Sequence, residues 1–364
     1  MKISPFEASY LDLQKIPHET AFFDTVKEQY LEYKTAGLFL HDPEEAIYLY
    51  RIESPERSYT GLVACADIED YLKGLIKKHE HTIVKHEQTQ LELLRQRAAS
   101  IKPVLITYPR VDEIQEALVA YAKQHQPFQS VKLGSDNHVF WRLTKSPFLD
   151  RIIALFDKQV PIAYIADGHH RTATLAMLYK SGMPEASKLL CAFFQPDELE
   201  ILGFHRVVEG LNGRTTDEFL EALKPLFVIK FLKKGMLPHR KLDIAACLST
   251  GEWFSLQWRK SVVKAMEDAN KIVFDAHLLN EKVLKPILGI KNIRRDNRVT
   301  YLKGTKDLLA IELAAKKLKE GVIFCLHPVY FEDMIALADS EGIMPPKSTF
   351  FAPRMLNGLL GYEI

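Results

Sequence analysis

The stretch Pro161–Lys180, PIAYIADGHHRTATLAMLYK, decides how the sequence around it folds. It opens with an apolar, partly β-branched run, Ile162–Ala166, whose length and composition are typical of a buried strand. From Arg171 onward, small and apolar residues recur at helical spacing, and Gly182 is placed to end a helix. The stretch therefore predicts a strand, a tight turn at Asp167–Gly168 and a helix.

The predicted turn carries five consecutive residues, Asp167, Gly168, His169, His170 and Arg171. The first N–H groups of a helix have no partner within it, and the helix dipole adds positive charge there, so a phosphate group is attracted. Arg171 and the two imidazoles strengthen that attraction, while Gly168 lets the backbone approach a ligand closely. Asp167 suits a Mg²⁺ ion or a substrate hydroxyl better than a phosphate. The alternative is an Asp N-cap before a solvated first turn, which needs neither the histidines nor the arginine.

Length and composition limit the function classes. A chain of 364 residues is long enough for one large domain or two to three modest ones. With 26% charged residues and a net charge of +1, it lacks the broad basic surface that nucleic-acid binding usually requires, although small anionic ligands remain compatible. The four widely spaced cysteines lie mostly in apolar runs, which predicts reduced, buried thiols and disfavours a cysteine zinc site. No stretch approaches the length of a membrane span, so we expect a soluble cytoplasmic protein.

Strands alternate with helices along the chain, which predicts a mixed α+β fold. Helices are expected over residues 19–34, 67–78, 84–97, 111–125, 147–156, 217–226, 275–288, 305–319 and 331–341. Strands are expected over residues 46–52, 61–67, 101–108, 138–143, 189–194, 227–232, 244–248, 253–257 and 322–326, with a further strand ending at Gly304. The first two strands are separated by a polar turn, which predicts a hairpin.

Three further polar clusters stand out. The run His79–Thr82 (HEHT) is either a solvated helix junction or part of a site with a distant partner. The pair His205–Arg206 is either an anion contact or an ordinary edge-strand pair. Near the end, Lys347–Thr349 follow two prolines and offer a cation and two hydroxyls in an extended loop.

Taken in this order, the clusters His79–Glu80, Asp167–Arg171 and Pro346–Thr349 resemble the motifs of archaeal ADP-dependent free-serine kinases, which have a ParB/sulfiredoxin-like nucleotide-binding fold. Over nearly its full length the chain is identified as a member of DUF1015, a bacterial family of unknown function. The segments that carry this resemblance are HEHT at 79–82, ADGHHR at 166–171, FHRVV at 204–208, LGI at 288–290, YLKG at 301–304 and MPPKSTFFAPR at 344–354.

The kinase resemblance implies a role for each motif residue. Glu80 would be the general base on an acceptor hydroxyl, and Asp167 would act with it and hold Mg²⁺. The residues implied to hold ADP or ATP are His79, Gly168, His169, His170 and Arg171, and those implied to contact the substrate are His205, Arg206, Lys347, Ser348 and Thr349. Phosphoryl transfer needs mainly positioning and positive charge, plus one base for the hydroxyl, so this division of roles is chemically consistent. The sequence has no P-loop and no protein-kinase signature, so the turn at 167–171 has to bind the phosphates.

We therefore expect three segments: 1–212, a ParB/sulfiredoxin-like domain; 213–310, a second α/β module; and 311–364, which packs back on the site. The expected function is a nucleotide- and Mg²⁺-dependent kinase for a small hydroxylated metabolite, free serine or a relative. One alternative is a ParB-like nucleotide-gated switch, although balanced charge and the lack of an evident helix-turn-helix disfavour DNA as its partner. The other is a metallohydrolase, although HEHT lacks the i, i+4 histidine spacing of a zinc helix.

Overall fold

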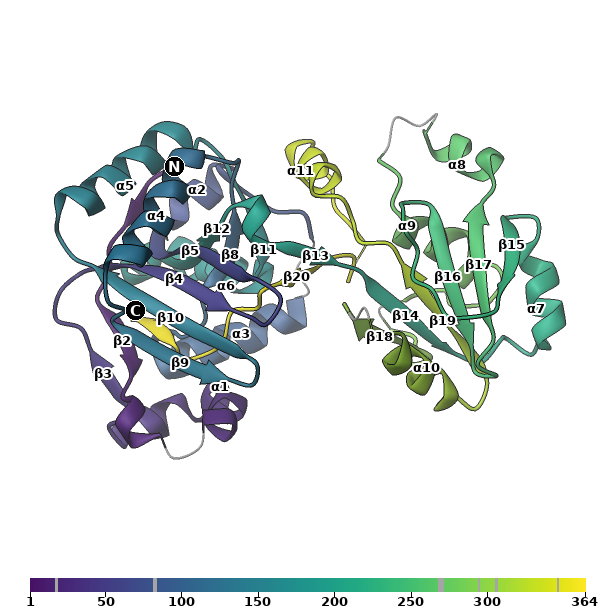
Figure 1. Cartoon of the computed structure of the whole chain (residues 1–364), viewed down its shortest axis with the longest axis horizontal. Coiled ribbons are helices and arrows are strands. Elements are labelled where there is room, and N and C mark those ends of the chain that lie inside the picture. Colours follow the sequence, from purple (N-terminus) through teal and green to yellow (C-terminus); the bar gives the residue numbers. More distant parts are fainter. Residues whose placement is uncertain (17–18, 81–83, 268–271, 294, 305–306, 346) are drawn as a thin grey trace. The chain divides into compact units, whose positions relative to one another are not determined.

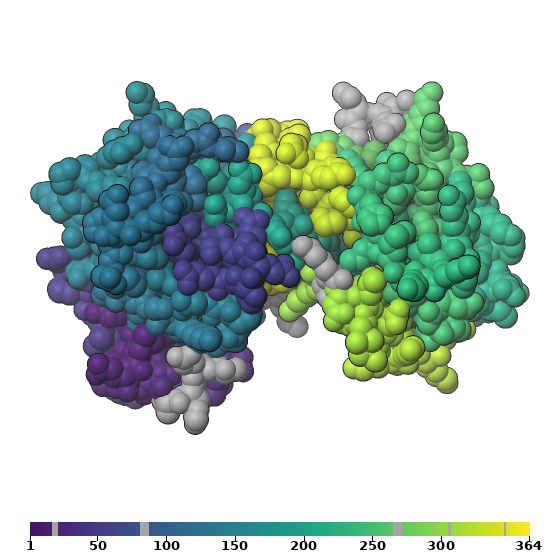
Figure 2. All heavy atoms as spheres, viewed as in Figure 1, coloured from purple at the N-terminus to yellow at the C-terminus, as the bar shows by residue number. Residues whose placement is uncertain are grey.

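The structure, a computed structural model of the whole chain, describes residues 1–16, 19–80, 84–267, 272–293, 295–304, 307–345 and 347–364. Figure 1 shows the course of the chain and Figure 2 its surface. The described residues form two compact units, Met1–Glu200 with Pro353–Ile364, and Ile201–Ala352. The chain therefore leaves the first unit, builds the second and returns. The sequence placed these divisions at 212 and 310 instead, and of the segment 311–364 the first unit holds only the part from Pro353 on.

The first unit is built on a nine-stranded mixed sheet (Figure 1). Eight strands follow the order β6-β11-β8-β12-β5-β4-β10-β9, and β1 pairs with β5 beside that path. The pairs β11–β6 and β12–β8 are parallel, whereas β4–β5, the predicted hairpin, is antiparallel. The strands are β1 (Ile3–Ser4), β4 (Ile47–Glu53), β5 (Ser58–Asp67), β6 (Ile76–Lys77), β8 (Val104–Thr107), β9 (Gln129–Leu133), β10 (Asp136–Leu143), β11 (Ala163–Asp167) and β12 (Lys188–Phe194).

Amphipathic helices pack on this sheet, and α5 shows why they form where they do. The Ser146 hydroxyl accepts a hydrogen bond from the Leu149 N–H at 3.3 Å, and Pro147 occupies the first helical position, where its missing N–H costs nothing. The buried residues Leu149, Ile152 and Phe156 then recur at helical spacing and face the core. The helices of this unit are α1 (Glu19–Thr35), α2 (Ile68–Leu72), α3 (Val84–Arg97), α4 (Asp112–Gln124), α5 (Pro147–Gln159) and α6 (His169–Lys180), with short 3₁₀ turns at Leu13–Lys15, Pro184–Ser187 and Pro196–Glu198.

One predicted helix of this unit is wrong in its second half. The helix expected over 67–78 ends with α2 at Leu72, and Gly74 follows with φ at +76°. Glycine occupies this left-handed region without strain, and it commonly ends helices. The chain then extends, and Ile76–Lys77 pair in parallel with β11 as β6. This correction matters for the site because β6 leads directly into His79 and Glu80.

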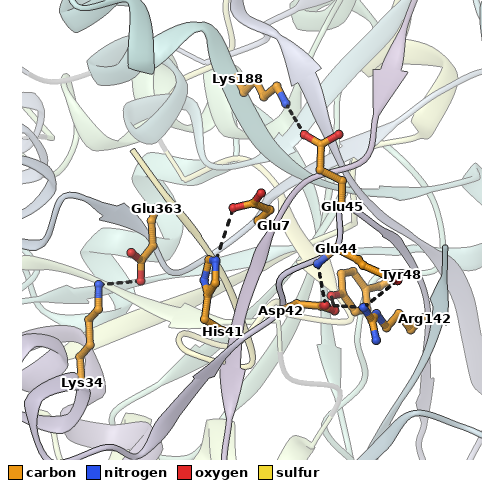
Figure 3. A network of polar contacts seen from close by, with 10 residues as sticks. All are labelled: Glu7, Lys34, His41, Asp42, Glu44, Glu45, Tyr48, Arg142, Lys188 and Glu363. Carbon is orange, nitrogen blue, oxygen red and sulfur yellow. Dashed lines mark hydrogen bonds and ion pairs between the residues drawn. The ribbon is translucent and has the colours of Figure 1, made fainter. Parts of the chain in front are cut away.

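A second, four-stranded sheet contains the C-terminal strand of the described chain. Its order is β3 (Phe39–His41), β2 (Ala8–Leu11), β21 (Leu360–Glu363) and β7 (Ala99–Ser100). Figure 3 shows polar contacts around it: Lys34 Nζ lies 2.6 Å from a Glu363 carboxylate oxygen, and the buried Asp42 accepts a hydrogen bond from the Tyr48 hydroxyl at 2.8 Å and pairs with Arg142. Strand β21 is therefore an integral part of the first unit.

The second unit is a six-stranded antiparallel sheet with helices on both faces. Its strand order is β15 (Phe227–Leu232), β17 (Trp253–Trp258), β16 (Asp243–Leu248), β19 (Gly321–Leu326), β14 (Phe204–Glu209) and β18 (Val299–Lys303). Strand β16 is buried on both faces, because Ile244 and Ala246 join one hydrophobic cluster while Ala245 and Cys247 join another. The helices are α7 (Thr216–Leu223), α8 (Lys260–Glu267), α9 (Asp275–Leu279), the π-helical segment η4 (Asn280–Leu284), α10 (Leu308–Lys316) and α11 (Phe331–Asp339), and β13 (Glu200–Leu202) pairs with β20 (Phe350–Ala352) as a separate small sheet.

Several general expectations are confirmed. The chain is a mixed α+β protein, and all four cysteines are free and buried. Among the described residues, no helix combines the length and apolarity needed to cross a membrane.

Candidate functional site

The strand-turn-helix predicted around residues 161–180 is confirmed. Strand β11 ends at Asp167, Gly168 turns the chain with φ at +115°, and α6 begins at His169. Glycine is required at 168 for two reasons. Its backbone conformation is rarely adopted by other residues, and a Cβ atom there would lie only 2.7 Å from Nη2 of Arg171. The guanidinium group of Arg171 therefore packs directly against the turn, at the end of α6 where backbone N–H groups lack helical partners.

Asp167 lies among positive charges. Its carboxylate is 3.4 Å from Nη2 of Arg171 and 3.7 Å from Nη2 of Arg354. Burial alone would raise the pKa of Asp167, but Arg171, Arg354 and Lys102 outweigh that effect and lower it to about 2. Asp167 is therefore ionised at physiological pH, and it serves as a fixed negative charge that orients the two guanidinium groups.

His79 contacts the turn from far away in the sequence. Its backbone N–H points to Nε2 of His169 at 3.5 Å, although the two residues are 90 positions apart. Their rings meet edge to face, with centroids 4.6 Å apart, and both side chains are buried. Burial lowers the pKa of His79 to about 4 and, with help from the neighbouring His79, lowers the pKa of His169 well below its usual value. Both imidazoles are therefore neutral at pH 7.

Glu80 follows His79 directly and is half-buried. Of the described residues in the HEHT run, His79 contacts the β11–α6 turn through a hydrogen bond. His170, the second residue of α6, is also half-buried. The other two residues of the predicted HEHT cluster, His81 and Thr82, lie outside the described residues.

A pocket of about 250 Å³ lies beside Arg171, between α1, α3 and α6 and the segment at 99–104. Four of its lining residues are cationic: Lys27, Arg97, Lys102 and Arg171. None of the described residues that line it carries a carboxylate. The apolar part of the wall is formed by Leu94, Ala99, Ile101, Val104, Leu175 and Leu189. The pocket, called here the cationic pocket, therefore combines concentrated positive charge with apolar surface.

The pKa of Lys102 shows how strongly the nearby positive charges act on one another. Burial, followed by the charges of Arg171, Arg354 and Lys27, lowers the pKa of Lys102 to about 8, although Asp167 acts in the opposite direction. The pKa of Arg97 is also lowered, mainly by burial. Because these cations repel one another, a negatively charged ligand in the cationic pocket would relieve the repulsion.

A family model described as "Protein of unknown function (DUF1015)" matches residues 5–281, which is more than half of the chain. The chain belongs to the DUF1015 family. No curated protein matches it.

Solved structures resemble this DUF1015 protein only weakly. C-terminally truncated SbnI from Staphylococcus aureus is 14% identical, with 81% of this chain and 85% of that chain covered and a TM-score of 0.42. A free serine kinase in complex with AMP is also 14% identical, with 82% and 91% covered and a TM-score of 0.41. A variant of a free serine kinase in complex with ADP is 13% identical, with 82% and 92% covered and a TM-score of 0.40. Likeness at this level supports no conclusion about function, and the ParB/sulfiredoxin-like core stays a prediction.

The residues predicted to contact substrate all belong to the second unit of the DUF1015 chain. His205 is buried, and its Nδ1 accepts a hydrogen bond from the Leu326 N–H at 3.3 Å. Ser348 is also buried, and its hydroxyl donates to the Pro345 carbonyl at 2.6 Å. Lys347 is exposed, with Nζ 5.5 Å from the centroid of the Phe204 ring, and Thr349 is half-buried. Arg206 is completely buried.

Sequence reasoning missed four cations of the first unit: Lys27, Arg97, Lys102 and Arg354. Arg354 ends the segment MPPKSTFFAPR, which the family resemblance associates with a site. Nothing in the sequence indicates that Arg354 pairs with Asp167. Lys27 and Arg97 belong to helices α1 and α3, where charged residues normally indicate a solvated face. No local pattern distinguishes them from ordinary surface cations.

Proposed function

We propose that this DUF1015 protein is a nucleotide- and Mg²⁺-dependent phosphotransferase that acts on a small hydroxylated metabolite, free serine or a relative. The observation that carries the proposal is the cationic pocket, where four cationic side chains and no described carboxylate surround about 250 Å³ beside the start of α6. A nucleoside di- or triphosphate matches this environment, because its phosphates need positive charge and helix N–H groups while its base and ribose tolerate apolar walls.

The side chains near the turn divide into two roles under this proposal. Arg171 and Lys102 neutralise charge on the phosphates, which is the main contribution a protein makes to phosphoryl transfer. Glu80 removes the proton from the acceptor hydroxyl, as the motif resemblance implies. His79 and His169 remain neutral and hold the segment that carries Glu80 against the turn.

The residues at the turn are compatible with Mg²⁺ that arrives with the nucleotide. Mg²⁺ is usually bound by one or two carboxylates together with substrate phosphates, and it spreads the negative charge that develops on them. Asp167 is ionised and supplies one such carboxylate. Among the described residues, no group of three or more His, Cys, Asp or Glu could hold a metal ion by itself, and a Mg²⁺ ion bound with nucleotide would take most of its ligands from the phosphates and water.

Calorimetric titration with MgADP and MgATP tests the binding part of the proposal. Arg171→Ala should weaken nucleotide binding by roughly 10- to 150-fold, since it removes a charge-assisted contact of about 1.5–3 kcal/mol. The matched control is Arg151→Ala on α5, because Arg151 pairs with Glu113 at 3.0 Å and does not line the cationic pocket. The control should bind nucleotide like the parent. Unchanged affinity in a folded Arg171→Ala protein would remove this residue from the site.

Transfer is tested by incubating the protein with nucleotide, Mg²⁺ and a pool of small hydroxylated metabolites that includes free serine. We expect a new phosphomonoester signal in the ³¹P NMR spectrum. If nucleotide binds in the calorimeter but no phosphorylated metabolite forms with either ADP or ATP, free serine and the other metabolites of the pool are excluded as acceptors, and a nucleotide-binding switch becomes the better assignment.

A further inference from the structure

Lys102 lines a pocket instead of an open surface. It lies between strands β7 and β8, and it shares the wall of the cationic pocket with Lys27, Arg97 and Arg171. The guanidinium group of Arg171 is fixed beside this segment, because its Nη2 donates a hydrogen bond to the Pro103 carbonyl at 3.3 Å. An anion that enters the pocket to meet these cations therefore reaches the same cavity as the Lys102 side chain.

The protonated form of Lys102 has little support from nearby carboxylates. None of the described residues that line the pocket is acidic. Asp167 acts on Lys102 through its charge, but its carboxylate is already 3.4 Å from Arg171 and 3.7 Å from Arg354. Lys102 therefore shares this negative charge with two guanidinium groups, which never give up their own protons in this pH range.

The surroundings of Lys102 favour its neutral, nucleophilic form. Burial, followed by the charge of Arg171, lowers the pKa of Lys102 to about 8; Arg354 and Lys27 act in the same direction, and Asp167 opposes them. Lysines that are desolvated beside other cations serve as nucleophiles for this reason. With such a pKa about a quarter of the Lys102 side chains are neutral at pH 7.5, compared with about one in a thousand for an ordinary lysine.

The rest of the pocket suits a short apolar group. Leu94, Ile101, Val104 and Leu175 belong to its wall, and the cavity volume is about 250 Å³. A short acyl chain fits against these side chains while an attached phosphate meets the cations. Acyl phosphates, the mixed anhydrides of a carboxylic acid and phosphoric acid, join these two groups through a reactive carbonyl. The pocket therefore matches both ends of an acyl phosphate and places an amine in the same cavity.

We propose that Lys102 is an acylation site, and that its acyl donor is an acyl phosphate held by the cations of the cationic pocket. The neutral amine attacks the carbonyl carbon, the bond from that carbon to the bridging oxygen breaks, and the phosphate leaves with the electron pair. The proton lost from the nitrogen passes to the phosphate. The products are an amide on Lys102 and hydrogen phosphate.

Acylation changes the charge of the pocket. The amide is neutral, so three of the four cationic side chains that line the pocket keep their charge. The modified pocket therefore attracts anions less strongly. Weaker nucleotide binding after acylation is the one consequence that rests on the proposed function, whereas the acylation itself requires only an anionic donor in the pocket.

Acetyl phosphate is the probe that tests the proposal. The whole protein is incubated with it at pH 7.5, and acetylation of each lysine is followed by tandem mass spectrometry. Lys188 is the internal control, because it pairs with Glu45 at 3.3 Å and does not line the cationic pocket. We expect Lys102 to be acetylated at least about 10-fold faster than Lys188, since more of its amine is neutral. Equal rates at the two lysines overturn the proposal.

A neutral reagent separates anion binding from simple reactivity. The N-hydroxysuccinimide ester of acetic acid transfers the same acetyl group but offers no phosphate to the cations. The ratio of Lys102 to Lys188 acetylation should be several times larger with acetyl phosphate than with the ester, and excess inorganic phosphate should lower only the acetyl phosphate ratio. Equal ratios with the two reagents mean that the pocket does not hold the donor, and they overturn the proposal.

Arg97→Gln is the most informative variant, because Arg97 lines the pocket but is not among the main charges that shift the pKa of Lys102. It should slow acetylation of Lys102 by acetyl phosphate roughly 3- to 10-fold and leave the ester rate nearly unchanged. The matched control is Arg151→Gln, since Arg151 pairs with Glu113 at 3.0 Å outside the pocket, and it should behave like the parent with both reagents.

An acetyl phosphate rate that does not change in a folded Arg97→Gln protein, or that falls in parallel with the ester rate, overturns the proposal. If Arg97→Gln does not fold, the comparison of the two reagents on the parent protein decides. No nucleotide is present in these measurements, so they decide the acylation site independently of the calorimetric titration that decides the proposed function.

Discussion

Arg171 in the first unit and Arg206 in the second differ in what surrounds the guanidinium group. The Arg171 side chain is 23% exposed, faces the carboxylate of Asp167 and lines a pocket of about 250 Å³. Arg206 is fully buried between aromatic rings, with two nitrogens that have no partner among the described residues. An anion therefore finds room already made at Arg171, whereas the Arg206 side chain has no exposed surface. We expect anions to bind the preformed site in the first unit rapidly, without a large conformational change.

The largest effect is expected for Glu80→Gln, which tests whether the chemistry belongs to the first unit. A general base acts on the acceptor hydroxyl only in the transition state, so turnover should fall by ~10²–10⁴-fold while nucleotide affinity stays nearly unchanged. Turnover and calorimetric affinity should be measured on the same variant.

Two other results for Glu80→Gln would give Glu80 a different role. Loss of both turnover and metal–nucleotide affinity would make Glu80 a ligand of the metal. Turnover within about twofold of the parent would rule out the base assignment and would leave the first unit with a binding function alone.

An intermediate effect is expected for Lys102→Met, which tests whether the cationic pocket is electrostatically strained without a ligand. The pKa of Lys102 is lowered to about 8 from an ordinary 10.5, so the folded state disfavours the charged amine. That penalty is fully present below pH 8 and disappears as the pH rises towards 10.5. At pH 7 the ligand-free variant should be more stable than the parent, by about 1–3 kcal/mol after allowance for solvent screening, and it should bind phosphate more weakly.

Urea unfolding of the parent and Lys102→Met at pH 7 and pH 10.5 checks this prediction. The stability advantage of the variant should shrink at the higher pH. An advantage that does not depend on pH would mean that methionine simply packs better than lysine, and the electrostatic explanation would fail.

The smallest effect is expected for Lys34→Ala, which provides a baseline for an ordinary surface charge. Lys34 and Glu363 lie 2.6 Å apart, but their side chains are 43% and 35% exposed (Figure 3). Exposed ion pairs contribute about 0–1 kcal/mol, so the free energy of unfolding should change by no more than that. A larger loss of the free energy of unfolding in chemical denaturation would show that the pair anchors β21.

The parts of the site that the sequence predicts well are those encoded locally. An apolar run, the Asp167–Gly168 break and the following helical spacing specify β11 and α6 within twenty residues, and the structure agrees. Gly168 is recognisable because only glycine fits the turn and the adjacent guanidinium.

The parts that the sequence does not predict depend on long-range pairing. The two-residue strand β6 is too short to carry a periodic signal, yet it pairs with β11 and brings His79 to His169. Lys27 and Arg97 line the cationic pocket only because α1 and α3 pack near α6, and nothing within those helices encodes that packing. The return of the chain to the first unit at Pro353 depends on β21 pairing with β2 and β7, which no local pattern encodes.

The return of the chain to the first unit at Pro353 has a consequence for biosynthesis. Residues 201–352 are translated before Arg354 and before β21, so the second unit leaves the ribosome before the first is complete. The nascent first unit therefore lacks both the strand that closes its smaller sheet and the arginine that pairs with Asp167. Domains commonly fold as they emerge during synthesis, but here the later unit has the opportunity to fold first. The pairing of Asp167 with Arg354 is thus acquired late, after the intervening unit has been made.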